Sequence, residues 1–248
     1  MEGISCRLLP FEVASGPANM AADEVLLESA AEGVATLRFY GWAQPTLSLG
    51  YFQPESARHV HEPLGALPFV RRPTGGQILV HHHEVTYALA LPSGNPWRRN
   101  AEKVCAWLER MHLVIADALR ELGVHTDLAT GSVAARGTAL CFLQPTAGDV
   151  LIGVHKIVGS AQRRRRGALL QHGAVLLAAS AHAPMLPGIQ ELSGLCLSDQ
   201  HVSSAISRRF SERFSCRLLP ADWSPRERDR IAELTRAQYT QPAWNLKR

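Results

Sequence analysis

The chain has 248 residues, of which 46% are hydrophobic and 19% charged, and its formal net charge is +4. These proportions are typical of a globular protein with a hydrophobic core and argue against a disordered chain. The apolar runs stop well short of the roughly 20 residues that a membrane span requires, and the first residues lack the pattern of a signal peptide. We therefore expect a cytoplasmic protein with no membrane partner. The mild positive excess favours an acidic partner over a nucleic acid.

The first third of the chain predicts one helix followed by several strands. Asn19 is a suitable N-cap for a helix that Gly33 would end. Apolar runs separated by turn signals predict the strands, which we place at 35–42, 46–52, 68–72, 77–80 and 85–91. In the last strand large apolar residues alternate with smaller ones, so we expect a half-buried strand.

The remainder predicts a second long helix, a group of short strands and a helical tail. Apolar spacings of three and four indicate a helix over 100–122, and Ser224-Pro225 is a helix start signal. Short strands are expected around 139–143, 149–153, 155–161 and 170–178. The hexapeptide SCRLLP occurs at both 5–10 and 215–220, which we interpret as a chance echo.

Strands in hairpins with a few long helices indicate an α+β fold with a largely antiparallel or mixed sheet. No linker rich in proline, glycine and serine divides the chain. We therefore predict one domain over 1–248, with 220–248 as a C-terminal helical appendage.

The cysteines argue for free thiols in a reducing compartment, because they are odd in number, widely spaced and without a CxxC pair. They are Cys6, Cys105, Cys141, Cys196 and Cys216. Most are expected to be small buried residues with structural effects only, and one is a candidate nucleophile.

Lysine is scarce, because only Lys103, Lys156 and Lys247 are lysines among 26 basic residues. Lys156 lies in the same segment as Cys141. An ammonium beside a thiol favours the thiolate, and the amine can then relay a proton. On neighbouring strands the two would form such a pair. The alternative is a core cysteine and a surface lysine.

Three other motifs are open to two interpretations. The segment 71–77 (RRPTGGQ) places paired glycines beside guanidiniums, which suits either a carbonyl or phosphate site or a plain hairpin. The segment 81–84 (HHHE) does not predict a metal site, because adjacent residues of a strand point to opposite faces; one inward histidine lining a pocket is expected instead. The run 163–166 (RRRR) is either a solvated hairpin tip or a docking patch for an acidic carrier protein.

Several segments together resemble the lipoate/biotin protein ligase superfamily, and most closely its cysteine-dependent octanoyltransferase branch. The matching segments are 19–28, 37–53, 71–89, 141–142, 155–177 and 239–245. The order of RRPTGG, then KIVGSAQ, then QHG is specific to this superfamily. Gln77 stands where the ligases commonly have a third glycine, which favours the transferase branch.

The resemblance implies a central mixed, mostly antiparallel sheet flanked by helices, and a tunnel for an eight-carbon acyl chain. It assigns catalysis to Cys141 and Lys156. It implies further that the following residues bind the substrate: Arg72, Thr74, Gly75, Gly76, His81, Gly159, Ser160, Ala161 and His172. No metal or cofactor is implied.

The implied reaction begins with attack of Cys141 on octanoyl-acyl carrier protein. The octanoyl group then passes to a lysine of a lipoyl domain, such as the glycine cleavage H protein, and we expect the enzyme to be a monomer. The alternatives are an octanoyl amidotransferase acting between lipoyl domains, an ATP-dependent lipoate ligase, and a carrier-binding protein without turnover.

Overall fold

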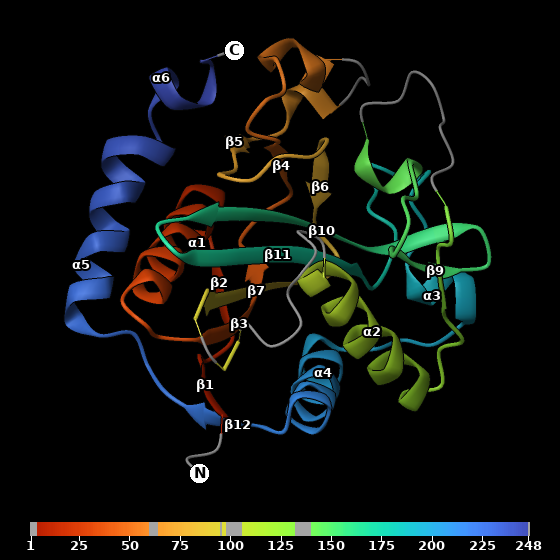
Figure 1. Cartoon of the computed structure of the whole chain (residues 1–248). Coiled ribbons are helices and arrows are strands. Elements are labelled where there is room, and N and C mark those ends of the chain that lie inside the picture. Colours follow the sequence, from red (N-terminus) through yellow and green to blue (C-terminus); the bar gives the residue numbers. More distant parts are fainter. Residues whose placement is uncertain (1–3, 60–63, 95, 98–105, 132–139, 248) are drawn as a thin grey trace.

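A large mixed sheet forms the centre of the computed structural model, which describes residues 4–59, 64–94, 96–97, 106–131 and 140–247 (Figure 1). Its described strands are β1 (Ile4–Leu8), β2 (Glu12–Ala14), β3 (Thr36–Trp42), β7 (Glu84–Pro92), β8 (Asp127–Leu128), β9 (Val150–Ile152), β10 (His155–Arg165), β11 (Ala168–Leu176) and β12 (Cys216–Pro220). They lie in the order β12-β1-β3-β7-β11-β10-β9-β8, with β2 beside β3. From β3 through β7 to β8 neighbours are antiparallel, whereas β12, β1 and β2 run parallel to their partners. The predicted α+β fold with a mixed, mostly antiparallel sheet is confirmed.

A smaller sheet lies beside the large one and has the order β5-β4-β6. Its strands are β4 (Thr46–Leu49), β5 (Phe69–Arg71) and β6 (Leu79–His81). The described helices are α1 (Gly16–Ala31), α2 (Ala106–Glu121), α3 (Ile189–Ser193), α4 (Asp199–Phe214), α5 (Pro225–Leu234) and α6 (Pro242–Asn245). Short helical turns are η1 (Glu55–His59), η2 (Leu64–Ala66), η3 (Cys141–Leu143) and η4 (Thr235–Tyr239). None of the described helices is long and apolar enough to cross a membrane.

Helices cover both faces of the large sheet, and the central strand β7 shows how. Its large side chains, among them Tyr87 and Leu89, belong to the core formed with α2 and α4. Its small residues Ala88 and Ala90 belong to the opposite core, formed with α1 and α5. The expectation of a half-buried strand is therefore wrong, because the small side chains leave room for α1 on the other face.

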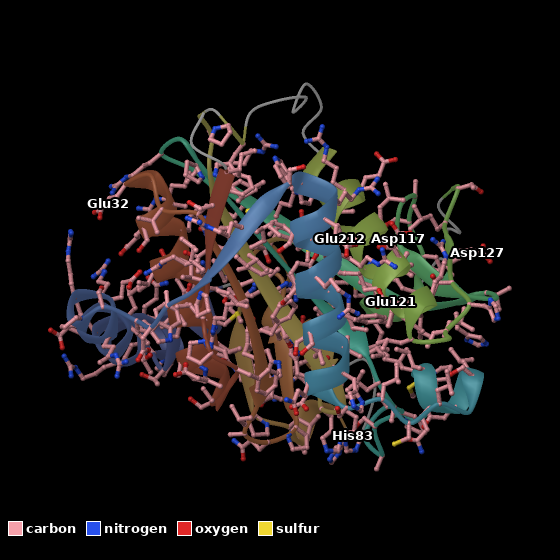
Figure 2. All side chains as sticks on the ribbon, turned by 90° about the horizontal axis from the view of Figure 1, so that it is seen from below. Glu32, His83, Asp117, Glu121, Asp127 and Glu212 are labelled. Atoms are coloured by element: carbon pink, nitrogen blue, oxygen red, sulfur yellow. The ribbon has the colours of Figure 1, made fainter. Side chains whose placement is uncertain are left out.

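Ion pairs join α2 to α4 at the surface. Figure 2 shows Asp117 and Glu121 of α2 near Glu212 of α4. Arg213 pairs with Asp117 at 3.5 Å and Arg209 with Glu121 at 2.8 Å. Because these side chains are exposed, the pairs contribute little to stability, and α2 and α4 are held mainly by their shared apolar core.

Local sequence signals predicted two helix starts. One is confirmed, and the other lies four residues before the predicted cap. Ser224 caps α5 in a capping box with Glu227, as the Ser-Pro signal predicts. Ser15, and not Asn19, caps α1 by accepting a hydrogen bond from the Ala18 N–H, and Pro17 is the second residue of the helix, where a proline is tolerated. Asn19 lies inside the helix. The second long helix is observed as α2 from Ala106, and its predicted start at 100–105 lies outside the described residues.

The two copies of SCRLLP lie next to each other. Strands β1 and β12 pair in parallel, with Ile4 opposite Cys216 and Cys6 opposite Leu218. The copies are therefore staggered by two residues, and their burial differs, because Leu9 is buried whereas the corresponding Leu219 is exposed. Burial raises the pKa of Cys216 to about 11 and that of Cys6 further. Both thiols are free and suited to packing.

Candidate active site

One cavity gathers most of the residues singled out from the sequence. It is narrow, with a volume of about 40 Å³. The predicted residues in its wall are Arg72, Gly76, His81, Cys141, Gly159, Ser160, Ala161 and His172. The rest of the wall is largely apolar or aromatic and includes Met20, Tyr40, Trp42 and Leu79. Segments far apart in the sequence thus meet around a narrow and largely apolar cavity that Cys141 lines.

Cys141 and Lys156 are in contact. The Lys156 Nζ donates to the Cys141 Sγ at 3.5 Å and to the Asp149 Oδ2 at 2.8 Å. Cys141 lies in the helical turn η3, so the strand predicted over 139–143 is wrong; residue 139 lies outside the described chain. The turn is fixed by tertiary contacts, because the Cys141 N–H donates to the Ile78 carbonyl and Phe142 is buried.

Asp149 is a site residue that the sequence reasoning missed. Its side chain is 4% exposed, like that of Lys156. Its Oδ2 also accepts hydrogen bonds from the backbone and the hydroxyl of Thr146, at 2.7 and 2.9 Å. This carboxylate fixes the amine at a defined position. Its place in the sequence between Cys141 and Lys156 was the available signal.

Gly159 provides the space in which the Lys156 side chain lies. A Cβ at residue 159 would stand 2.5 Å from the Lys156 Cε and 2.9 Å from its Nζ. Any larger residue would displace the amine from Cys141. The small residues 159–161 line the cavity, and Gly159 leaves the room that the Lys156 side chain occupies.

His112 of α2 is a second residue that the sequence reasoning missed. Burial lowers its pKa, so the ring is neutral and carries one N–H. The Gly148 carbonyl can only accept, so the His112 Nδ1 donates to it at 2.7 Å, and the Nε2 accepts from the Ser160 hydroxyl at 2.6 Å. Ser160 in turn accepts from Tyr87 at 2.6 Å. The Ser160 hydroxyl proton therefore points toward His112. Through its hydrogen bond to the Gly148 carbonyl, His112 anchors the turn that carries Asp149.

His81 lies in the wall while its two neighbours point elsewhere. Its ring stacks on Trp42 with centroids 3.7 Å apart. Its Nδ1 donates to Glu84 at 2.6 Å, and its Nε2 lies 2.8 Å from the Ser48 hydroxyl. His82 and His83 stack on each other instead. Within the described ranges, no group of three or more histidine, cysteine or acidic residues could hold a metal ion.

Thr74 and Gly75 do not line the cavity, but Thr74 contacts the wall residue His172. The Thr74 hydroxyl lies 2.6 Å from the His172 Nε2, and the His172 Nδ1 donates to Asp23 at 2.7 Å. Asp23 also accepts from Tyr40 at 2.8 Å and from Arg38 at 3.2 Å. These buried hydrogen bonds fix the ring of His172 against the helix α1.

The two guanidiniums of the 71–77 segment diverge. Arg71 donates to carbonyls outside the cavity, including those of Gly50 and Asn245, each at 2.9 Å. Arg72 alone lines the cavity and folds the glycine turn by donating to the Gly75 carbonyl at 2.8 Å. Gly76 has a φ of +91° in this turn, a conformation that favours glycine. The segment is therefore a shaped wall of the cavity.

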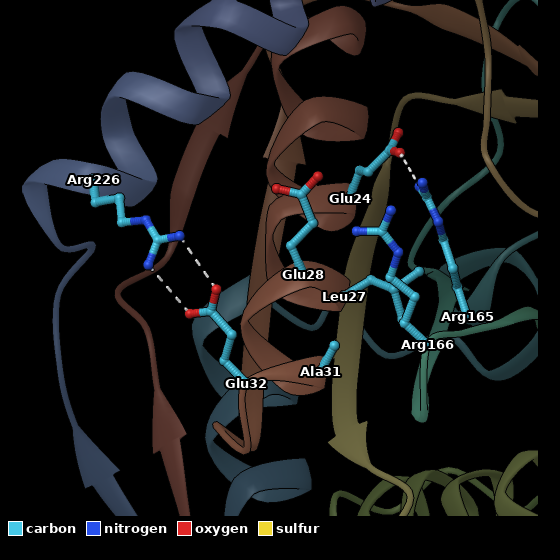
Figure 3. A pocket seen from close by; sticks show the side chains of 8 residues that line it. All are labelled: Glu24, Leu27, Glu28, Ala31, Glu32, Arg165, Arg166 and Arg226. Atoms are coloured by element: carbon cyan, nitrogen blue, oxygen red, sulfur yellow. Dashed lines mark hydrogen bonds and ion pairs between the residues drawn. The ribbon is translucent and has the colours of Figure 1, made fainter.

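The arginine run borders a second cavity of about 430 Å³ (Figure 3). Its lining residues are Glu24, Leu27, Glu28, Ala31, Glu32, Arg165, Arg166 and Arg226. Arg165 pairs with Glu24 at 3.2 Å, while Arg163 donates to the Pro73 carbonyl at 2.8 Å. Part of the run is thus engaged within the protein, and a docking patch for an acidic carrier stays a prediction. No nucleophilic side chain lines this second cavity, so the cavity that contains Cys141 is the better candidate for the active site.

Comparisons with known proteins show which family the chain is similar to. The family model described as the lipoyl protein ligase A/B catalytic domain matches residues 15–196. A protein named octanoyltransferase LipM from Kyrpidia tusciae is 32% identical, over 98% of this chain and 98% of its own length. Another of that name, from Moorella thermoacetica, is 33% identical, over 98% of this chain and 97% of its own length.

Solved structures share the fold. A lipoate-protein ligase A bound with ATP superposes with a TM-score of 0.79 at 21% identity, covering 98% of this chain and 99% of that chain. A bipartite lipoate protein ligase from Thermoplasma acidophilum gives a TM-score of 0.77 at 21% identity, covering 98% and 96% of the two chains. At this identity the similarity concerns the fold alone.

Proposed function

The chain belongs to the lipoyl protein ligase A/B catalytic domain family, and we propose that within this family it carries octanoyl on Cys141 from an acyl carrier protein to a lysine of a lipoyl domain. Its octanoyltransferase relatives, about 30% identical, make it an acyltransferase that transfers octanoyl in lipoate biosynthesis. The donor, the covalent intermediate and the acceptor are our proposal. The contact between Lys156 and Cys141 is the observation that supports it.

The first half-reaction exchanges one thioester for another. The Cys141 thiolate attacks the octanoyl carbonyl carbon, a new C–S bond forms, and the C–S bond to the carrier breaks. The departing carrier thiolate takes a proton from the Lys156 ammonium, which becomes a neutral amine. Asp149 holds the amine in place throughout.

The second half-reaction forms the amide. The neutral amine of the acceptor lysine attacks the same carbon, and Cys141 leaves as a thiolate. The amine gives a proton to Lys156, which restores the starting ion pair. Thioester exchange is nearly isoenergetic and amide formation is downhill, so neither step requires ATP.

The apolar wall supplies recognition of the acyl chain. Trp42, Met20 and Leu79 line the cavity near Cys141. Burial of seven methylene-like groups contributes roughly 5 kcal/mol, at about 0.8 kcal/mol each, before the cost of ordering the chain. The buried acyl chain then keeps the thioester carbonyl carbon next to the Cys141 sulfur.

The test is the intact mass of the protein after incubation with octanoyl-acyl carrier protein without ATP. One octanoyl group should appear on the wild type and on Cys196→Ser, whose thiol is exposed, and hydroxylamine should remove it. No adduct should form on Cys141→Ser. An adduct that persists on Cys141→Ser would contradict the proposed nucleophile.

A second assay separates the alternatives. Addition of an unmodified lipoyl domain should discharge the adduct and leave octanoyl on one of its lysines. If an octanoylated lipoyl domain, and not the carrier, charges the enzyme, the protein is an amidotransferase. Acceptor modification that requires ATP and free octanoate would instead indicate a ligase. Binding of the carrier without an adduct would indicate a binding protein.

A further inference from the structure

The short helix α6 lies beside strand β5, where it binds Arg71 (Figure 1). Arg71 is 0% exposed. The Asn245 Oδ1 accepts from the Arg71 backbone N–H at 2.8 Å, and the Asn245 carbonyl accepts from the Arg71 Nη2 at 2.9 Å. The Trp244 Nε1 donates to the Arg71 carbonyl at 2.8 Å. The helix α6 is therefore bonded to both the backbone and the side chain of Arg71.

The same guanidinium holds the loop 50–53, which follows strand β4. The Arg71 Nη1 donates to the Gln53 carbonyl at 2.6 Å and to the Gly50 carbonyl at 2.9 Å. The Gly50 N–H donates to the Gln53 side chain at 2.9 Å. Arg71 thus joins this loop to Asn245, which lies 174 residues later in the chain.

The loop 50–53 in turn supports the glycine turn of the cavity wall. The Tyr51 N–H donates to the Thr74 carbonyl at 2.8 Å. Gly50 packs directly on Gly76, because a Cβ at residue 50 would overlap the Gly76 carbonyl. Gly76 lines the cavity together with Cys141. A displacement of the loop would therefore be passed to the cavity wall, since no space separates the two backbones.

We infer that Asn245 is a positioning residue for octanoyl transfer, because it holds the loop 50–53 and the glycine turn in place through Arg71. Asn245 lies outside the cavity and is 8% exposed. Loss of its side chain would remove the acceptor of the Arg71 N–H and allow the loop to shift. A misplacement of about 1 Å can lower a reaction rate roughly a hundredfold. The effect on transfer rests on the proposed function, whereas the anchoring of the loop does not.

The test compares two substitutions of Asn245 that differ in the contact to Arg71. Asn245→Leu keeps the branching of the side chain but loses its hydrogen bonds to Arg71 and to the Tyr239 carbonyl. Asn245→Asp keeps an acceptor for the Arg71 N–H and loses only the bond to Tyr239. With octanoyl-acyl carrier protein as the varied substrate, Asn245→Leu should lower kcat roughly tenfold to a hundredfold and leave KM within about threefold of wild type. Asn245→Asp should stay within about threefold of wild type in both.

Amide hydrogen exchange, followed by mass spectrometry, measures the anchoring without any reaction. Peptides covering 48–55 and 72–78 should exchange at least about tenfold faster in Asn245→Leu than in wild type, and close to the wild-type rate in Asn245→Asp. Glu227→Gln is the matched control, because Glu227 attaches the same C-terminal segment to β1 and α1 and the substitution leaves the bonds of Arg71 intact. Its kcat and its exchange in both peptides should stay within about threefold of wild type.

Trp244→Phe provides a milder variant if Asn245→Leu does not fold. It keeps an aromatic ring and loses the bond to the Arg71 carbonyl, so kcat should fall at least about threefold; a wild-type kcat would count against the inference.

The inference is overturned if Asn245→Leu transfers octanoyl like wild type, if Asn245→Asp is as slow as Asn245→Leu, or if Glu227→Gln matches Asn245→Leu in both measurements. If the exchange pattern holds but the wild type transfers no octanoyl, the proposed function fails and the anchoring of the loop by Asn245 stands.

Discussion

Lys156 lies in a position that fits a proton-carrying amine and nothing larger. Gly159 and Asp149 confine its side chain on two sides. We expect Lys156→Arg to keep the charge but to lower the rate of octanoyl transfer by at least about a hundredfold, because the guanidinium does not release its proton and does not fit the space. Steady-state transfer to a lipoyl domain at pH 7 measures the effect.

Lys247→Arg is the matched control. Lys247, in the C-terminal tail, lies over the rings of Tyr51 and Trp244. An arginine at this position can make the same cation–π contacts. It should transfer octanoyl like the wild type. A normal rate in Lys156→Arg would contradict a proton-transfer role for this lysine.

The sequence identified some site residues and missed others for a physical reason. Lys156 was identified because lysine is scarce and a thiol lies in the same segment. His112 was hidden among the polar positions of a helix, and its partners Gly148 and Ser160 lie 36 and 48 residues away. Contacts of this kind depend on how elements pack, which no local spacing reports.

At the scale of elements, strand β10 positions the amine through a missing side chain. In Gly159→Ala the new Cβ would overlap the Lys156 Cε, which stands 2.5 Å from that position. The amine must move by about an ångström, so we expect transfer to fall roughly tenfold to a hundredfold while β10 remains paired. Gly94→Ala is the control, because no atom lies within 4 Å of the Cβ position there. Equal activity of the two variants would show that the amine is not confined.

Elements were predictable where local chemistry determines them. The start of α5 follows from Ser224 and Pro225, which act within one turn. The strand predicted at Cys141 is a helical turn, since its conformation depends on the distant Ile78 carbonyl. Strands β1 and β12 pair across about 200 residues of sequence. The repeated hexapeptide therefore could not be recognised from local sequence as two neighbouring strands.

At the scale of the molecule, one carboxylate joins the C-terminal helix to the rest of the fold. Glu227 of α5 accepts from Arg7 of β1 at 2.7 and 3.1 Å and from Ser29 of α1 at 2.8 Å. It also caps its own helix through Ser224. The segment 220–248, which we predicted to be an appendage, is therefore attached to both β1 and α1 by this group. Loss of its charge should loosen that attachment.

Glu227 also makes stability depend on pH in a defined direction. Burial alone would raise its pKa, but hydrogen bonds from Arg7, Ser224 and Ser29 lower it to about 2 from the usual 4.5. On acidification the unfolded chain binds the proton first, so this contribution is complete above about pH 4.5 and is lost as the pH falls toward 2.

We expect Glu227→Gln to lower the free energy of unfolding at pH 7 by roughly 1–3 kcal/mol, and to lose less further stability than wild type between pH 5 and pH 3. Urea unfolding at the three pH values measures both effects, with Glu32→Gln as the control because its partner Arg226 is exposed. Parallel pH profiles for wild type and Glu227→Gln would contradict this role.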